Sequence, residues 1–144
     1  MNQLLSHMEF SVIQMLLNGE GITFKTLRQQ LSHCHVRQRT FTGVGFITEL
    51  EVDATISGLT DKSRIIWGDV LGNIEEIKNG VGFILILENG YLRMLEGYSF
   101  GEPWPEQAKL LNLWYEDSTR RKIPEALSSV GISLIENSDL PPTP

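Results

Sequence analysis

The stretch that decides the fold runs from Val81 to Tyr98 and reads VGFILILENGYLRMLEGY. Within it, Asn89-Gly90 is a preferred type I′ hairpin turn, and an apolar run lies on each side. The stretch therefore predicts an antiparallel β-hairpin. Both faces of the hairpin are rather apolar near the middle, which predicts a central position in a sheet, with cover on both sides.

The two-residue turn also predicts how residues pair across the hairpin. The predicted pairs are Leu87–Leu92, Leu85–Met94 and Phe83–Glu96. Glu96 would then end an apolar stripe as a candidate buried acid, whose pKa is raised by desolvation and suits a general acid or base. The alternative is that Glu96 reaches water at the end of its strand, or accepts hydrogen bonds from the loop at Ser99.

Two short helices are predicted before the sheet, over residues 8–17 and 23–32. Apolar residues recur there at spacings of three and four. Ser6 and Glu9 match a capping box at the start of the first helix. Gly19 and Gly21 end this helix, so the two helices form a hairpin.

After His33 the apolar period changes from helical to alternating. Strands are predicted over residues 35–41, 45–52 and 64–71, with a loop between 54 and 63. The fold class that follows is α+β, with two N-terminal helices packed on a mainly antiparallel sheet of about four to six strands and short C-terminal helical elements.

The C-terminal part allows more than one interpretation. A helix could cover residues 106–113 with Pro105 at its first position, or residues 113–116 could be extended. Pro124 could open a short helix over 124–130, and residues 132–135 form a short apolar run. We expect a single domain over 1–136 and a flexible proline-rich tail over 137–144.

Composition excludes several classes of protein. The chain has 144 residues, of which 41% are hydrophobic and 21% charged, with a net charge of -6. No stretch approaches the ~20 apolar residues of a membrane span, and the N-terminus lacks the order of a signal peptide. The acid excess disfavours nucleic acid as a partner. We therefore expect a cytoplasmic protein that binds neither membrane nor nucleic acid.

Charged residues alternate along two predicted strands. The basic row is His35, Arg37 and Arg39, and the acidic row is Glu49, Glu51 and Asp53. If the strands pair, the rows lie side by side. They form either a solvated face laced with ion pairs or a charged recognition surface for a protein partner.

An aromatic loop follows the hairpin. Trp104 stands between two prolines, near Tyr98 and Phe100, with the acids Glu102 and Glu106 beside them. Rigid aromatics beside acids are common at protein interfaces and also as lids over a small core.

Motifs that would indicate chemistry are absent from the sequence. There is no Walker loop, nucleophile elbow, zincin helix or paired-cysteine site. His33-Cys34-His35 is the one compact group of soft ligands. A third ligand could come from His7, Glu49, Glu51 or Asp53, but nothing in the spacing demands that these groups converge. A helix-to-strand junction where polar residues meet solvent is the favoured interpretation. We expect no metal, no cofactor and no catalytic residue.

A short echo links two parts of the chain. Residues 43–47 read GVGFI, and residues 80–84 repeat the same five letters. Either the chain contains a duplication, or both strands begin at a crowded point where glycine lets a neighbour approach.

Four motifs together resemble a group of small uncharacterised bacterial proteins of about this length. They are residues 27–31 (LRQQL), 42–46 (TGVGF), 80–83 (GVGF) and 95–98 (LEGY), and the resemblance covers most of residues 8–106. Some small acidic α+β proteins of this kind resemble immunity proteins of bacterial toxin systems. That resemblance implies a cytosolic protein that binds one toxin domain tightly and performs no chemistry. The shared motifs are structural glycines and aromatics, so no functional residue is carried over.

Three functions follow as expectations. The first is a non-enzymatic protein-binding module, with an immunity-type inhibitor of a basic toxin domain as its sharpest form. Its expected partner-binding residues are Glu49, Glu51, Asp53, Tyr98, Glu102 and Trp104. The second is a small enzyme or ligand-binding domain centred on Glu96 and the 98–104 loop. The third is a homodimer that buries an apolar second sheet face against its own copy.

Overall fold

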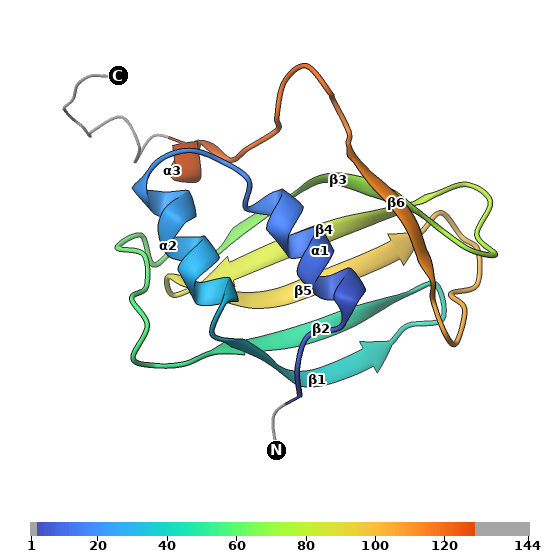
Figure 1. Cartoon of the computed structure of the whole chain (residues 1–144), viewed down its shortest axis with the longest axis horizontal. Helices are drawn as coiled ribbons and strands as arrows, with labels where there is room; N and C mark the ends of the chain where they lie inside the picture. Colours follow the sequence, from blue (N-terminus) through green and yellow to red (C-terminus); the bar gives the residue numbers. More distant parts are fainter. Residues whose placement is uncertain (1–2, 129–144) are drawn as a thin grey trace.

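The computed structural model describes residues 3–128 as a six-stranded sheet with two helices across one face (Figure 1). All strand pairs are antiparallel, in the order β1-β2-β5-β4-β3-β6. The elements in chain order are α1 (His7–Leu16), α2 (Ile22–Leu31), β1 (Cys34–Phe41), β2 (Gly45–Val52), β3 (Ile65–Ile74), β4 (Val81–Glu88), β5 (Tyr91–Ser99), β6 (Leu110–Tyr115) and α3 (Glu125–Ser128). The predicted α+β class is confirmed. The predicted tail over 137–144 and the apolar run at 132–135 lie outside the described residues.

Both helices begin and end as the sequence predicts, to within a residue or two. Ser6 Oγ accepts a hydrogen bond from the Glu9 amide (3.1 Å), and Glu9 Oε1 accepts one from the Ser6 amide (2.7 Å), which completes the capping box. Arg28 closes the turn between the helices by donating to the carbonyls of Leu17 and Gly19.

The central hairpin has the predicted turn but a different register. Asn89 and Gly90 both have positive φ, as a type I′ turn requires. A β-bulge at Arg93 gives β5 one extra residue. The observed pairs are Leu87–Leu92, Leu85–Leu95, Phe83–Gly97 and Ile84–Glu96. The predicted pairing of Phe83 with Glu96 is therefore wrong, because the bulge turns Glu96 to the opposite face.

The core lies between the helices and one face of the sheet. Its largest fully buried side chains are Phe24, Phe83, Ile13, Leu16, Leu17, Leu27, Leu50, Ile74, Leu85, Leu87, Leu92 and Leu95. A buried amide joins the two layers: Gln30 donates to the carbonyls of Ser57 and Gly90 and accepts from the Leu92 amide (2.9 Å). α2 is thereby fixed to the turn of the central hairpin.

The two copies of the GVGFI echo flank the same strand. Gly45 and Gly82 both pair with Tyr98, one from each side of β5. A Cβ at Gly45 would lie 2.0 Å from the Gly97 carbonyl oxygen, and one at Gly82 would lie 2.4 Å from the Tyr98 ring. Both copies thus place glycine where a neighbour approaches closely, as the crowding interpretation expects. At Gly45 that neighbour is backbone, and at Gly82 it is a side-chain ring.

One alternative predicted for residues 106–113 was a helix. That alternative is wrong, because the strand β6 lies there instead. The strand pairs with the edge of β3 and bends toward α1, where Tyr115 Oη donates to the Met15 carbonyl (2.9 Å). The apolar residues of 110–114 fit a helical spacing as well as an alternating one. The edge of β3 decides between them, because its backbone groups need a partner.

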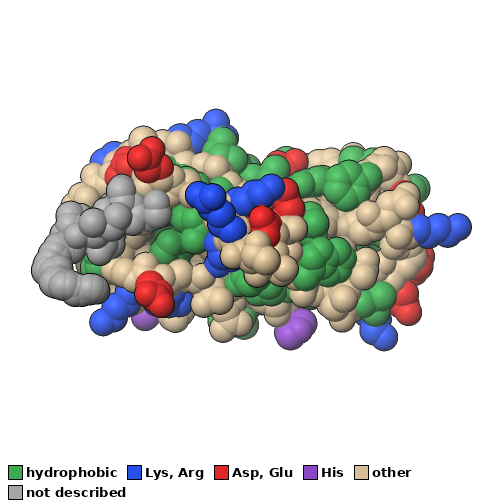
Figure 2. Space-filling model, turned by 90° about the horizontal axis from the view of Figure 1, so that it is seen from above, with side chains coloured by type: hydrophobic (Ala, Val, Ile, Leu, Met, Phe, Trp, Pro, Cys, Tyr) green, Lys and Arg blue, Asp and Glu red, His purple; other side chains and the backbone are tan. Residues whose placement is uncertain are grey.

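The segment between β6 and α3 is held by one buried ion pair. Arg121 Nε lies 2.6 Å from Oδ2 of the buried Asp69, and the guanidinium stacks on Tyr115, 4.1 Å from its ring centre. Arg121 also donates to carbonyls at the end of α1. Figure 2 views this side of the molecule and shows basic and acidic side chains grouped in the middle, with hydrophobic side chains around them.

No helix among residues 3–128 is long and apolar enough to cross a membrane.

Candidate functional site

The sheet face opposite the helices carries many apolar side chains, and no element of the described chain covers it (Figure 1). We call this surface the open face. Its apolar residues, assigned from strand register, are Ile47, Ile66, Leu71, Ile84, Ile86, Met94, Tyr98 and Trp114. None of them belongs to the buried core cluster or packs against it. Ile66 and Trp114 are exposed, Ile86 is 6% exposed, and the other five are half-buried by their neighbours. The predicted cover on both sides of the central hairpin is therefore wrong for residues 3–128.

The side chains of the open face form rows across neighbouring strands. One row passes from Tyr98 over Gly82 to Leu71 and Trp114. Phe100, which is 59% exposed, extends it with an edge-to-face contact to Tyr98 (5.7 Å between ring centres). This row thus crosses four strands, with the aromatic side chains of Tyr98 and Trp114 at its two ends.

Two further rows place acids among aliphatic side chains. Glu96 lies between Ile47 and Ile84 in the middle of the sheet. The next row is Glu49, Met94, Ile86 and Ile66, which ends with Ile66 at 51% exposure. Among residues 3–128, neither Glu96 nor Glu49 forms an ion pair. The open face therefore carries two carboxylates without ion pairs among its apolar side chains. At its end, Arg64 and Arg93 both pair with Glu88.

Glu96 is half-buried rather than buried, so the prediction of a buried acid is wrong. The bulge at Arg93 is the reason, because it moves Glu96 from the core face to the open face.

The predicted basic row is also wrong in part. His35 lies opposite Glu51, but β1 has a bulge at Arg37 that changes the face of every later residue. Arg39 consequently lies on the helical side, where it pairs with Glu9 (2.7 Å). The two charged rows do not run side by side along their whole length.

The six predicted partner-binding residues lie in several places. Glu49, Glu51 and Tyr98 share the open face. Asp53 instead accepts hydrogen bonds from the amide and hydroxyl of Thr55, and these bonds lower its pKa. Glu102 and Trp104 belong to the loop after β5.

The loop after β5 is held in place at two points. The Glu102 carboxylate accepts hydrogen bonds from the amides of Lys78 and Asn79 (both 2.9 Å), which lower its pKa. Trp104 crosses to the helical side and packs edge-to-face on Phe46 (5.4 Å between ring centres). The aromatics of the loop therefore divide between two surfaces.

The His33-Cys34-His35 group does not converge. Cys34 lies in the core, and burial raises the pKa of its thiol to about 12. His33 instead places Nδ1 3.2 Å from the Gln29 carbonyl oxygen. No three histidine, cysteine or acidic side chains within residues 3–128 lie together as a metal site would require.

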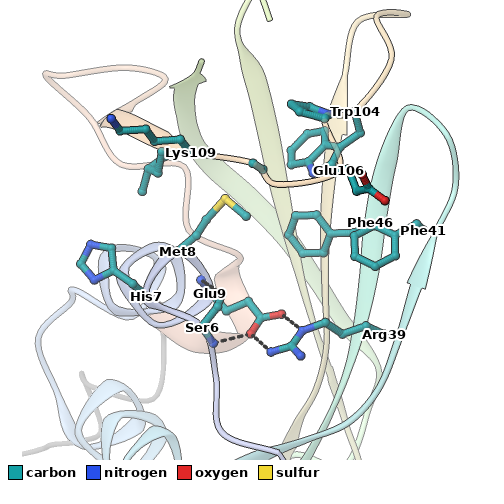
Figure 3. A pocket seen from close by; sticks show the side chains of 13 residues that line it. Ser6, His7, Met8, Glu9, Arg39, Phe41, Phe46, Trp104, Glu106 and Lys109 are labelled. Carbon is teal, nitrogen blue, oxygen red and sulfur yellow. Dashed lines mark hydrogen bonds and ion pairs between the residues drawn. The ribbon is translucent and has the colours of Figure 1, made fainter. Parts of the chain in front are cut away.

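A pocket of about 420 Å³ opens on the helical side, between the start of α1, the end of the β1–β2 hairpin and the loop before β6 (Figure 3). Its apolar lining includes Met8, Phe41, Phe46, Trp104 and Leu110. Arg39 and Phe41 come from one edge strand of the sheet and Leu110 from the other. The curl of the sheet toward its helices builds this pocket.

One wall of the pocket is a closed hydrogen-bond network around Glu9, which is 2% exposed. Arg39 donates to both carboxylate oxygens (2.7 and 2.8 Å), and Thr48 Oγ1 donates to Oε2 (2.7 Å). Burial acts to raise the pKa of Glu9, but hydrogen bonds from Arg39, Ser6 and Thr48 outweigh it and hold the pKa below its ordinary value. Every lone pair of the Glu9 carboxylate accepts a hydrogen bond. Glu9 therefore holds this wall of the pocket in place.

Sequence reasoning assigned Glu9 only to the helix cap and missed its ion pair. A signal for its burial was present, because Glu9 precedes Val12, Ile13 and Leu16 by three, four and seven residues and so shares their helix face.

Comparison with protein-family models, with curated proteins and with solved structures returns no match to this chain.

Proposed function

We propose that this protein is a binding module whose open face takes a protein partner with basic and apolar side chains. The observation that carries the proposal is the set of apolar side chains on five strands that no described element covers. A sheet normally buries its apolar faces against another layer, and large exposed apolar patches mark interaction sites.

The charge of the open face favours a basic partner. Glu49 and Glu96 stand among the aliphatic residues, and the whole chain carries a net charge of -6. A partner with lysine or arginine beside its apolar anchors would pair with these carboxylates and be steered toward them in solution. An immunity-type inhibitor that occupies a basic toxin domain is the sharpest form of this proposal.

A second copy of the chain fits the open face less well. Glu96 lies on the third of six strands, near the middle of the sheet. A symmetric face-to-face dimer centred there would bring the two Glu96 carboxylates together, and like charges at such a contact are unfavourable.

The test uses charge reversal with a matched control. Tagged wild-type protein should capture a basic partner at low salt and release it at high salt. The variants Glu96→Lys and Glu49→Lys should each fail to capture this partner at low salt. Glu20→Lys makes the same change of charge at an exposed residue between the helices, and it should keep the partner. Thermal unfolding of all three variants verifies that they fold.

Two outcomes would contradict the proposal. In one, Glu20→Lys weakens capture as much as Glu96→Lys, which would make net charge alone responsible. In the other, light scattering gives a dimer of wild-type protein that Ile66→Lys dissociates, which would make a second copy the occupant.

A further inference from the structure

A second hollow of about 350 Å³ adjoins the pocket on the helical side. Phe41, Gly43, Trp104, Pro105 and Glu106 line it, and all but Gly43 also line the larger pocket. We call the two hollows together the aromatic pocket.

The Trp104 wall of the aromatic pocket is held in place by its own contacts. The Trp104 amide donates to the Gly43 carbonyl (2.8 Å), prolines stand on both sides of Trp104, and its ring rests against Phe46. Phe41 is 64% exposed, which is unusual for a large apolar side chain on an edge strand. Ring faces held in place and open to solvent are the surfaces that attract organic cations.

The unpaired charges divide between the two ends of the aromatic pocket. Figure 3 shows the Glu106 carboxylate at the same end as the rings of Phe41 and Trp104, while Lys109 and His7 lie at the other end. Arg39 lies below Phe41, where its charge is paired with Glu9. In the smaller hollow Glu106 is the one charged residue among those described. Within residues 3–128 it forms no ion pair, whereas the other lining carboxylate, Glu9, is saturated.

We propose that the aromatic pocket binds an organic cation with apolar substituents, of the alkylated ammonium class. The cationic group would lie against the rings of Phe41 and Trp104 with Glu106 as its counter-ion. The rest of the ligand would extend over Met8 and Leu110 in the larger hollow. Such sites combine ring faces with a nearby carboxylate, and water is partly excluded from them.

The experiment is an NMR titration of the full chain with probes matched in shape. Choline and benzyltrimethylammonium should shift the Trp104 indole signal, which Trp104→Leu identifies among the three tryptophans. The neutral isostere 3,3-dimethylbutan-1-ol has the shape of choline without its charge, and it should bind about tenfold more weakly or worse. Glu106→Gln and Phe41→Leu should each weaken choline binding by about fivefold or more, and Glu20→Gln should leave it unchanged.

A trimethyllysine peptide separates the two sources of such a cation. Free choline binding at least as tightly as the peptide indicates a small molecule, whereas tighter binding of the peptide indicates a side chain of a partner. Equal binding of choline and its neutral isostere would overturn the proposal. So would the absence of any shift at millimolar choline, or binding of acetate at the Lys109 end in place of choline. None of these outcomes depends on the open face.

Discussion

The ion pair between Glu9 and Arg39 should contribute a large part of the stability that joins α1 to the sheet. Glu9→Gln is the informative change, because glutamine can still accept a hydrogen bond from the Ser6 amide and so keeps the capping box. It removes the negative charge that Arg39 and Thr48 approach to 2.7 Å. The substitution therefore tests the charge and leaves the helix cap in place.

The size of the effect follows from burial. Breaking a buried pair typically costs about 3–5 kcal/mol, because one charge is left unpaired. Here the side chain of Arg39 is 26% exposed, so water can solvate part of it. We expect Glu9→Gln to lower the free energy of unfolding by about 2–3 kcal/mol. Glu9→Ala also loses the cap and should cost roughly 1 kcal/mol more.

The free energy of unfolding that Glu9→Gln loses should depend on pH in a defined direction. The folded pKa of Glu9 lies below the ordinary value of 4.5, so the unfolded chain takes up the proton first as pH falls. The stabilisation is complete above about pH 4.5 and is lost as pH falls through the folded pKa. The difference in unfolding free energy between wild type and Glu9→Gln should thus be constant near neutrality and shrink below about pH 4.5.

Urea unfolding at several pH values measures this difference. Glu20→Gln is the control, with an expected change within about 0.5 kcal/mol, because Glu20 is exposed. In a double-mutant cycle, Arg39→Met added to Glu9→Gln should cost much less than the sum of the two changes. Three results would refute the reasoning. The first is that Glu9→Gln lowers the free energy of unfolding by less than about 1 kcal/mol, and the second is that the effects of Glu9→Gln and Arg39→Met add. The third is a difference between wild type and Glu9→Gln that grows as pH falls.

Three further predictions concern buried groups. Gln30→Leu should lower the free energy of unfolding by about 3 kcal/mol in urea, because it leaves the Leu92 amide and the Ser57 carbonyl without their side-chain partner. The Gly90 carbonyl keeps its hydrogen bond from the Leu59 amide. Gln29→Leu on the exposed face should have little effect. Arg121→Ala should lower the free energy of unfolding by about 3 kcal/mol, because it breaks the buried ion pair with Asp69. Arg120→Ala, at an exposed residue, should lower it by less than about 0.5 kcal/mol. Equal effects of the two substitutions would contradict the role given to the ion pair. The thiol of Cys34, with its pKa at about 12, should react with a thiol reagent at the rate of unfolding between pH 7 and 9, and rapid labelling of the native protein would show that it is accessible.

Local signals in the sequence were sufficient for the fold class and for the elements from α1 to β5, but not for β6. The capping box at Ser6 located α1, and Asn89-Gly90 located the central hairpin, because a few neighbouring residues decide each of these structures. The alternation from Gly45 to Val52 likewise assigned the two faces of β2, as the buried Thr48 and Leu50 show.

The face of individual residues could not be predicted past the bulges. One extra residue at Arg37 and another at Arg93 reversed the faces of Arg39 and Glu96. A bulge depends on the twist of a strand against its partners, and one sequence carries little signal for it. The aromatic pocket was missed for a related reason. It joins α1, both edge strands and the Trp104 loop, which only the curl of the sheet brings together.

The most direct test of the open face is photo-crosslinking from single positions in cells that produce the protein. A photoreactive phenylalanine derivative at Ile66 faces outward from this surface, and the same group at Lys25 reports on the exposed side of α2. The account predicts a crosslink to a basic partner protein from position 66 and none from position 25. Crosslinks only to another copy of the chain, or the same products from both positions, would contradict it.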